Sequence, residues 1–209
     1  MPKGSKALSR ARETEIIDAC AELYETMGFR DITIRDIGEK TTFTRTSIYN
    51  YFRTKEEIFL ALLTREHAAW CAQLEAALIS RAPLRVKDFA EALGSTLEKR
   101  GCMLKLMSMN LYDMECGSRI ENLVAFKLEY ARAFDTLSRA LECSFPQMTA
   151  ADRQAFLYAF FPFLFGVYPY TSHTEKQKEA MARAQVDYAA YTVPMLVQSF
   201  AGRWLAPYA

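Results

Sequence analysis

The chain has 209 residues, of which about half are hydrophobic, and this proportion allows a substantial core and excludes global disorder. The formal net charge is only +1, so the whole molecule is not a polycation that would bind nucleic acid through bulk charge. Eight glycines and seven prolines are few for this length, and their scarcity favours long helices.

The first elements predicted along the chain are a basic arm and a helix. Residues 1–12 carry four basic side chains and no acidic one, and we interpret residues 1–8 as a flexible basic arm suited to a polyanion. A solvated terminus without a ligand is the alternative. From residue 10 to residue 27 apolar residues recur at helical spacing, and Gly28 follows where a helix C-terminus favours a left-handed residue.

Two short helices come next, joined by a turn of three residues. Thr33 is the expected N-cap of the first, with Asp36 placed to complete a capping box. The turn is residues 41–43, and Thr44 is the expected N-cap of the second helix, which extends to about residue 51. This pattern predicts a helix-turn-helix, whose second helix enters the major groove in DNA-binding examples. A helical hairpin that binds no nucleic acid is the alternative.

The second short helix has one apolar and one polar side. Ile48 and Phe52 are spaced to face the protein interior. The residues spaced to face outward on one side are Arg45, Thr46, Tyr49 and Asn50. Arginine can donate two parallel hydrogen bonds to a guanine edge, asparagine can bond an adenine edge in two places, and hydroxyl groups suit phosphate oxygens. The outer side therefore predicts a DNA-reading surface.

Residues 13–63 resemble the N-terminal DNA-binding domain of the TetR/AcrR-type, tetracycline-repressor-like, transcriptional regulators. The resemblance is carried by TTFTRTSIYNYF at 41–52 and Lys55-Glu56-Glu57, together with Ile17, Ala21, Gly28, Phe29, Thr33, Ile34 and Ile37. The chain departs from the family pattern at Thr42 and Thr46, where the family often has glycine.

The resemblance implies an all-α protein with an N-terminal three-helix helix-turn-helix DNA-binding domain and a C-terminal helical domain for ligand binding and dimerisation. We expect these domains at residues 9–53 and 54–209, with the helix at 54–79 linking the two. Tyr49, Lys55 and Thr33 resemble the phosphate-contacting residues of the family, and Arg45, Thr46 and Asn50 would face base edges. The expected DNA-binding set is Thr33, Thr44, Arg45, Thr46, Tyr49, Asn50 and Lys55.

The remainder of the chain is predicted to be helical, without strand-like alternation. We expect helices at 54–79, 86–99, 102–113 and 118–142, one that follows an N-cap at Thr149, and two more at 174–185 and 192–205. Residues 155–172 contain no charge, which predicts a helix buried on several sides. A membrane span is the alternative, but the run is shorter than the roughly 20 apolar residues a span needs and contains two prolines, so we expect none.

The uncharged helix and the last helix are expected to pair with the same helices of a second copy. The predicted homodimer interface consists of Phe161, Phe165, Val193, Leu196, Val197, Phe200 and Trp204. A dimer places two recognition helices about 34–36 Å apart, which suits a palindromic operator.

Aromatic and methionine residues of the C-terminal part offer an adaptable lining for a small-molecule effector, although plain core packing explains each of them individually. The predicted lining is Trp70, Met103, Met107, Tyr112, Phe126, Tyr130, Phe134, Phe156 and Phe160. As a set they favour an apolar or aromatic ligand.

No catalytic or cofactor site is predicted. His67 and Cys71 have metal-ligand spacing on one helix, but two ligands are too few, and packing is the default interpretation. The five cysteines are scattered without a CxxC pair, and no signal-peptide pattern opens the chain, so we expect a reduced cytoplasmic protein. The chain also lacks a nucleophile elbow and a phosphate loop, and we expect no enzyme activity.

The expected function is therefore that of a sequence-specific DNA-binding transcriptional regulator. In the resembling family such proteins are most often repressors, and we expect release from the operator by a small apolar or aromatic ligand. The alternative is a dimeric helix-turn-helix regulator without a small-molecule inducer, which is controlled by a protein partner or acts constitutively.

Overall fold

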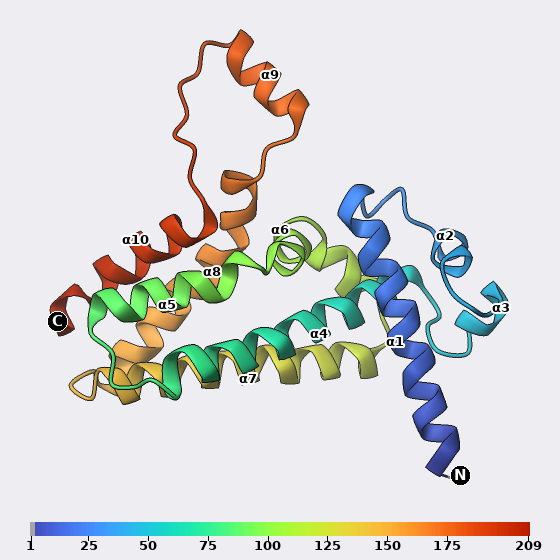
Figure 1. Cartoon of the computed structure of the whole chain (residues 1–209), viewed down its shortest axis with the longest axis horizontal. Helices are drawn as coiled ribbons and strands as arrows, with labels where there is room; N and C mark the ends of the chain where they lie inside the picture. Colours follow the sequence, from blue (N-terminus) through green and yellow to red (C-terminus); the bar gives the residue numbers. More distant parts are fainter. Residues whose placement is uncertain (1–2) are drawn as a thin grey trace. The chain divides into compact units, whose positions relative to one another are not determined.

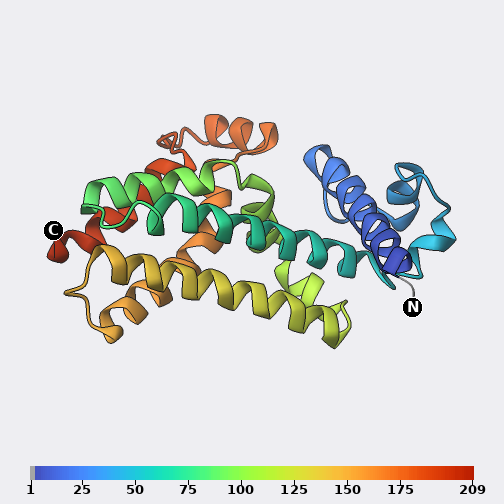
Figure 2. The ribbon, with the colours of Figure 1, turned by 60° about the horizontal axis from the view of Figure 1, so that its bottom comes forward.

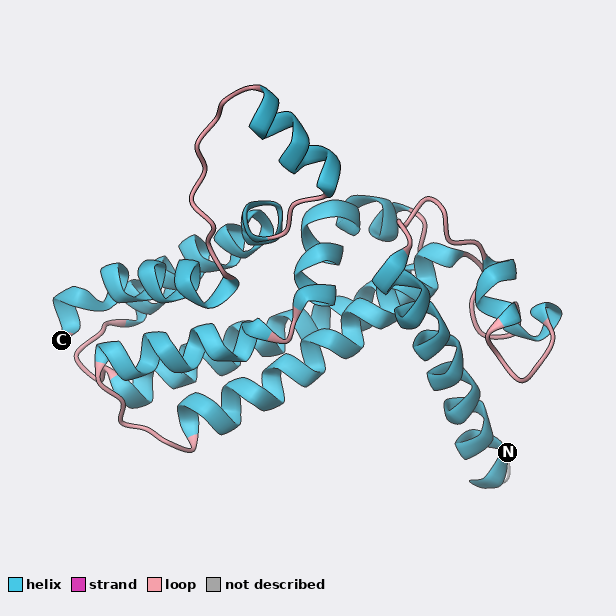
Figure 3. Cartoon of the chain, turned by 45° about the horizontal axis from the view of Figure 1, so that its top comes forward, coloured by secondary structure: helices cyan, strands magenta, loops and turns pink. Residues whose placement is uncertain are grey.

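The computed structural model describes residues 3–209, and within that range every regular element is helical and no strand is present (Figure 3). This confirms the all-α class predicted from the sequence. The elements are α1 Lys3–Thr26, α2 Ile34–Glu39, α3 Arg45–Ile48, α4 Lys55–Leu74, a π-helical turn Glu75–Ile79, α5 Val86–Glu98, α6 Gly101–Cys116, α7 Ile120–Ser144, α8 Ala150–Thr171, α9 Glu175–Arg183, α10 Val193–Leu205 and a 3-10 turn Ala206–Tyr208 (Figure 1).

The chain forms two compact units. The first runs to Glu66 and includes Asn110–Tyr130, and the second consists of His67–Met109 and Ala131–Ala209. Helices α4, α6 and α7 each contribute residues to both units, so the division falls inside helices. The predicted domain ranges 9–53 and 54–209 follow the sequence resemblance and stay a prediction.

The first helix begins earlier than the sequence pattern predicted. α1 starts at Lys3, so the described part of the expected flexible arm is helical, and residues 1–2 of that arm lie outside the described range. Lysine, alanine, leucine and arginine, all good helix formers, fill most of the early positions, which explains the extension. The buried side of α1 follows the predicted spacing, because Ile16, Cys20 and Tyr24 are no more than 2% exposed.

The core of the first unit joins α1 to the two short helices and to the start of α4. The ring of Phe59 on α4 lies 5.2 Å from that of Tyr24 and 4.7 Å from that of Phe29, measured between centroids. Ile37 of α2 and Ile48 of α3 are fully buried. The apolar sides of both short helices therefore face this core, as predicted, and the opposite side of α3 is left in solvent.

Helix α4 continues directly into the π-helical turn, and the two form one continuous helical ribbon in Figure 2. The predicted extent of the helix, 54–79, is confirmed. In its last turn the hydrogen bonds join residues five apart, as in a π-helix, and the N–H of Ser80 donates to the carbonyl of Glu75 at 3.0 Å.

In the second unit α5 and α10 lie side by side (Figure 1). A Cβ atom at Gly94 of α5 would lie 3.1 Å from the carbonyl oxygen of Pro194, so glycine permits this close approach. Val197, Ala201 and Leu205 form the buried side of α10.

The uncharged run predicted to be buried forms most of α8. Thr149 and Asp152 close its N-terminus as a capping box. The α8 residues with buried side chains are Phe156, Leu157, Phe160, Phe161, Leu164 and Val167. Among the described residues, none of the helices has the length and apolar character needed to cross a membrane.

Candidate nucleic-acid interface

The N-terminus of α2 is closed by the predicted capping box. The Thr33 hydroxyl donates to Asp36 Oδ2 at 2.7 Å, and the N–H of Thr33 donates to the same oxygen at 2.8 Å. In return the N–H of Asp36 donates to Thr33 Oγ1 at 3.3 Å. These bonds from the Thr33 side chain and backbone hold the pKa of Asp36 below its ordinary value. Thr33 itself is exposed at the start of α2.

The turn between the two short helices is fixed by polar contacts. The Thr41 hydroxyl donates to the carbonyl of Phe43 at 3.1 Å, and the N–H of Thr42 donates to Glu15 Oε1 of α1 at 2.5 Å. The guanidinium of Arg12 lies 5.7 Å from the centre of the Phe43 ring. No residue between α2 and α3, all of which the structure describes, has a positive φ. Thr42 therefore replaces the usual glycine of the family without backbone strain.

The second short helix is shorter than predicted. α3 ends at Ile48, and the chain continues in turns in which the N–H groups of Tyr51 and Phe52 both donate to the carbonyl of Ile48, at 2.9 and 3.0 Å. Threonine, isoleucine, tyrosine and asparagine are weak helix formers, and the Thr44 side chain does not cap the helix, since its hydroxyl lies 3.1 Å from that of Ser47. We call residues 45–52 the recognition segment.

The outer side of the recognition segment is polar and open to solvent. Its exposed residues include Arg45, Thr46, Tyr49 and Asn50, as the sequence pattern predicted, and Thr44 directly before the segment is exposed as well. Arg45 Nη2 donates to the Tyr49 hydroxyl at 3.4 Å, a weak bond that leaves most of the guanidinium donors available. Beneath them Ile48 is fully buried, so a rigid apolar base supports a polar outer surface.

Lys55 lies against protein carbonyls in this structure. Its ammonium donates to the carbonyls of Phe29 at 2.8 Å, Ile32 at 3.2 Å and Arg30 at 3.4 Å, and it lies 4.7 Å from the centre of the Phe29 ring. The three donors of a lysine ammonium are thereby occupied. Lys55 thus binds the loop between α1 and α2, while a phosphate contact stays a prediction.

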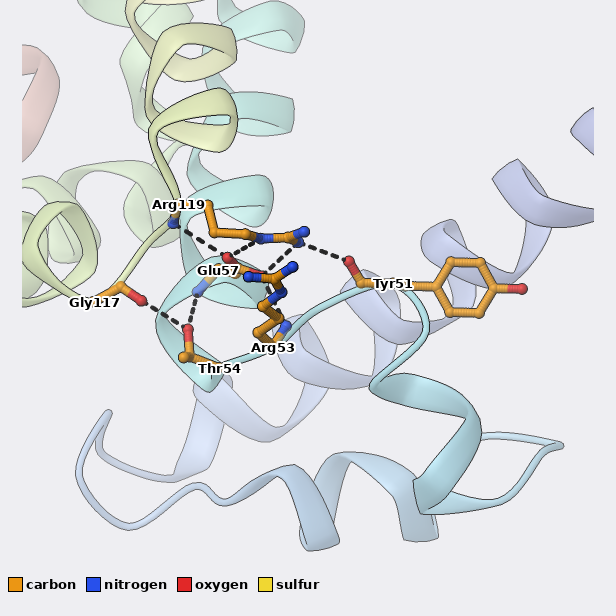
Figure 4. Close-up of polar contacts among 6 residues, drawn as sticks. All are labelled: Tyr51, Arg53, Thr54, Glu57, Gly117 and Arg119. Carbon is orange, nitrogen blue, oxygen red and sulfur yellow. Dashed lines mark hydrogen bonds and ion pairs between the residues drawn. The ribbon is translucent and has the colours of Figure 1, made fainter.

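The start of α4 holds an ion pair that no sequence pattern predicts. Glu57, 1% exposed, accepts hydrogen bonds from Arg119 Nε at 2.6 Å and Nη2 at 2.9 Å (Figure 4). Burial raises the pKa of Glu57, but the bonds from Arg119 and from the N–H of Arg53 outweigh it, and the net pKa is lowered. The partners are 62 residues apart, and no periodicity or motif connects them.

The predicted effector lining is divided between the two units. In the first, Tyr112 is 79% exposed, whereas Phe126 is buried and Tyr130 half-buried. The second unit contains the other six predicted lining residues. Phe134 is half-buried, and the buried ones are Trp70, Met103, Met107, Phe156 and Phe160. Phe156 and Phe160 stack with centroids 5.6 Å apart, and Trp70 Nε1 donates to Thr96 Oγ1 at 3.0 Å.

Two cavities in the second unit have other linings. One of about 550 Å³ lies between the end of α4 with its π-helical turn and α5, and is lined by Gln73, Ala76, Ala77, Arg81, Asp88, Glu91, Ala92, Ser95 and Thr96. The other, of about 920 Å³, lies between the N-terminus of α5, the end of α7 and the end of α10. The predicted lining residues contribute to neither cavity.

The predicted dimer residues differ in accessibility. Phe161 and Val197 are buried within the single chain, at 1% and 0% exposure, because they pack on their own unit. Those with side chains at least partly accessible are Phe165, Val193, Leu196, Phe200 and Trp204. Trp204 is 43% exposed and stacks on Phe200 with centroids 6.0 Å apart.

His67 and Cys71 are both buried in the second unit, and His67 packs edge-on against Trp70 with ring centroids 6.4 Å apart. Within residues 3–209, no three histidine, cysteine, aspartate or glutamate side chains gather closely enough to hold a metal ion.

Comparison with known proteins gives matches along most of the chain. Residues 16–62 match the bacterial regulatory proteins of the tetR family, and residues 64–202 match the tetracyclin repressor-like C-terminal domain. Among curated proteins, the HTH-type transcriptional regulators YfiR and YdgC of Bacillus subtilis (strain 168) are 32% identical over 62 residues and 38% identical over 53 residues. These stretches are 30% and 25% of this chain, and the chain spans only 30% and 27% of the length of those relatives.

Solved structures share the fold over nearly the whole length. The transcriptional regulator FadR of Bacillus subtilis, determined in complex with stearoyl-CoA, has a TM-score of 0.62 at 16% identity, with 92% of this chain and 97% of that chain covered. A TetR/AcrR-family regulator from Thermobifida fusca has a TM-score of 0.59 at 17% identity, with 95% and 99% covered. Since the C-terminal family match alone covers more than half of the chain, this protein belongs to the tetR family of bacterial regulatory proteins, which are transcriptional regulators and not enzymes.

Proposed function

We propose that the protein is a homodimeric, sequence-specific DNA-binding regulator that acts as a repressor and leaves its operator when a small apolar or aromatic ligand binds. The observation that supports this most directly is the recognition segment. It presents exposed arginine, threonine, tyrosine and asparagine side chains above a fully buried Ile48. A polar outer surface on a rigid apolar base is what a helix inserted in the major groove requires.

The proposed contacts divide into base-reading and phosphate-binding groups. Arg45, Thr46 and Asn50 would meet base edges, because their side chains are exposed and of the types that discriminate base pairs. Tyr49, Thr44 and Thr33 would place hydroxyl groups on phosphate oxygens. Thr33 stands at the N-terminus of α2, where its hydroxyl already donates to Asp36. A phosphate contact would therefore require that hydroxyl to rotate away from Asp36, or would be made by neighbouring backbone N–H groups.

A second copy would cover the accessible apolar side chains of α8 and α10. Tyr158 on α8 is 65% exposed, and Met195 and Trp204 on α10 are 49% and 43% exposed. Large exposed apolar groups on two adjacent helices are typical of a protein interface. We therefore retain α8 and α10 as the dimer helices. Phe161 and Val197 would support the interface from below, because they pack within their own chain.

The size of the cavities supports a small-molecule effector. Small-molecule sites usually have volumes of about 300–1,000 Å³, and both cavities of the second unit fall within that range. Their linings mix polar and apolar groups, so the apolar class of the ligand stays a proposal from sequence. The buried packing of Met103, Met107, Phe156 and Phe160 favours the second candidate function, a regulator without a small-molecule inducer.

Two experiments on the purified protein test the proposed assembly and then separate the two candidate functions. Analytical ultracentrifugation at micromolar concentration should show a dimer, and a monomer would contradict the proposed assembly. Fluorescence anisotropy on a selected duplex should then show release by members of a panel of aromatic compounds and fatty acyl chains. Binding that no panel member weakens, with no ligand-induced rise in melting temperature, would favour the regulator without an inducer.

A further inference from the structure

The C-terminal end of the recognition segment is held by residues that do not face the DNA-reading side. Beyond Ile48 the segment is no longer a regular helix, so its own hydrogen bonds do not fix the backbone of residues 50–53 as firmly as a long helix would. The backbone there is bonded instead to two side chains, Glu57 and Arg119. Both residues lie in the first compact unit.

Each of these side chains bonds both its partner and the backbone at the end of the recognition segment (Figure 4). Arg119 Nη2 donates to the carbonyl of Tyr51 at 3.2 Å as well as to Glu57 Oε2. The N–H of Arg53 donates to the same Glu57 oxygen at 2.7 Å. The Tyr51 ring points away from the network, so only its backbone takes part (Figure 4). A planar guanidinium fork suits this simultaneous contact, whereas an ammonium does not.

The turn that carries Arg119 is itself fixed against the start of α4. The Thr54 hydroxyl donates to the carbonyl of Gly117 at 2.9 Å, and the N–H of Arg119 donates to Glu57 Oε1 at 3.2 Å. A Cβ atom added at Gly117 would lie 2.5 Å from Glu56 Cγ and 2.8 Å from Glu56 Cβ. Glycine is therefore needed for the turn to approach α4 this closely, and even a methyl group would push the two apart.

We propose that Arg119 and Glu57 are positioning residues for DNA recognition, which set the backbone of Tyr51–Arg53 and thereby the orientation of the recognition segment in the major groove. This inference rests on the proposed function. It adds that operator affinity depends on the turn at residues 117–119, which contributes no DNA-facing group. The pair acts through the backbone, so its effect falls on the sequence-specific part of binding.

Two substitutions test the positioning role and leave the net charge unchanged. Arg119→Lys keeps the positive charge but removes the fork, and Gly117→Ala keeps both ionic partners but displaces the turn. We expect each to weaken binding to the preferred duplex about tenfold, the size of one lost base contact, with affinity for random duplex kept within about twofold. Arg65→Lys is the matched control, since Arg65 pairs with Asp18 between α4 and α1 and does not contact the recognition segment. It should bind both duplexes as the native protein does.

Hydrogen exchange separates positioning from general stability. In Arg119→Lys the amides of residues 49–56 should exchange faster, because the N–H of Arg53 loses a well-held acceptor, while the amides of α1 and α2 keep their native rates. Preferred-duplex affinity within about twofold of native for both variants would overturn the proposal. So would a loss of affinity accompanied by faster exchange throughout α1 and α2, since the pair would then be only structural.

The outcome for the native protein keeps this inference separate from the proposed function. If the native protein prefers no duplex sequence, the proposed function fails. If the native protein shows a preference that both variants retain, only the positioning role fails.

Discussion

Replacing Glu57 with glutamine should destabilise the first unit strongly at neutral pH. The Glu57 carboxylate accepts four hydrogen bonds, two from the Arg119 guanidinium, one from the N–H of Arg119 and one from the N–H of Arg53. Each carboxylate oxygen accepts two of them. In either orientation of a glutamine amide, its NH₂ group would face two donors where an acceptor is needed.

The size of the effect follows from the burial of the two partners. Removing one partner of a buried ion pair costs about 3–5 kcal/mol. Glu57 is 1% exposed, but the side chain of Arg119 is 35% exposed and can recover water. We therefore expect Glu57→Gln to lower the free energy of unfolding by about 3 kcal/mol, at the lower end of that range.

The effect should depend on pH with a defined sign. The pKa of Glu57 is lower in the folded protein than its ordinary value, so the folded state favours the ionised carboxylate. The resulting stability is fully present above the pKa of the unfolded carboxyl, about 4.3, and is lost as the pH falls through the lower folded pKa. The difference between native protein and variant should thus be largest near neutrality and shrink in acid.

Urea unfolding followed by circular dichroism, at one protein concentration and at several pH values, measures this difference. Glu56→Gln is the control, because it makes the same chemical change on a half-buried neighbour in the same turn. A destabilisation below about 1 kcal/mol at neutral pH, or one that does not change between neutral and acid pH, would refute the reasoning from the ion pair.

Substitutions at three further positions test other parts of the structure. Ile48→Ala should lower the free energy of unfolding by about 2–4 kcal/mol because it leaves a cavity at a fully buried site, and Ile48→Val should lower it by about 1 kcal/mol. Urea unfolding that gives the same loss of stability for both variants would contradict this. Lys55→Met should cost about 1–2 kcal/mol of stability because Lys55 bonds three carbonyls, and unfolding in urea at native stability would contradict this. The expected phosphate contact predicts in addition a salt dependence of DNA binding that is flatter by about one unit of slope. Trp204→Ser should raise the dimer dissociation constant by roughly tenfold in sedimentation experiments, and an unchanged constant would place the interface elsewhere.

Local sequence signals predicted the helices and most of their ends. Thr33 and Thr149 were expected as N-caps, and each forms a reciprocal capping box in the structure. A capping box involves residues three apart, so sequence spacing is sufficient to find it. The buried stripe of α1 and the uncharged α8 were found for the same reason, since helical periodicity is a local property.

The polar contacts between distant segments were not predictable in the same way. Glu57 was interpreted as part of the Lys55-Glu56-Glu57 motif that carries the family resemblance, and its partner Arg119 belongs to a turn 62 residues later. Lys55 was expected to contact phosphate because its position matches a family pattern, and that contact stays a prediction. Its carbonyl partners in the loop at residues 29–32 become visible only once α1 and α4 are packed. Which of several aromatic side chains line a cavity also depends on packing, and the sequence does not distinguish a lining residue from a core residue.

Selection of bound sequences from a random duplex pool at low salt tests the central claim most directly. The native protein should enrich an inverted repeat with half-sites about one helical turn apart, and Arg45→Ala should lower affinity for that site by about 1–3 kcal/mol while relaxing one base position in each half-site. A folded native protein that enriches no sequence, or an Arg45→Ala variant that enriches the same site with unchanged affinity, would contradict the assignment of the recognition segment to DNA reading.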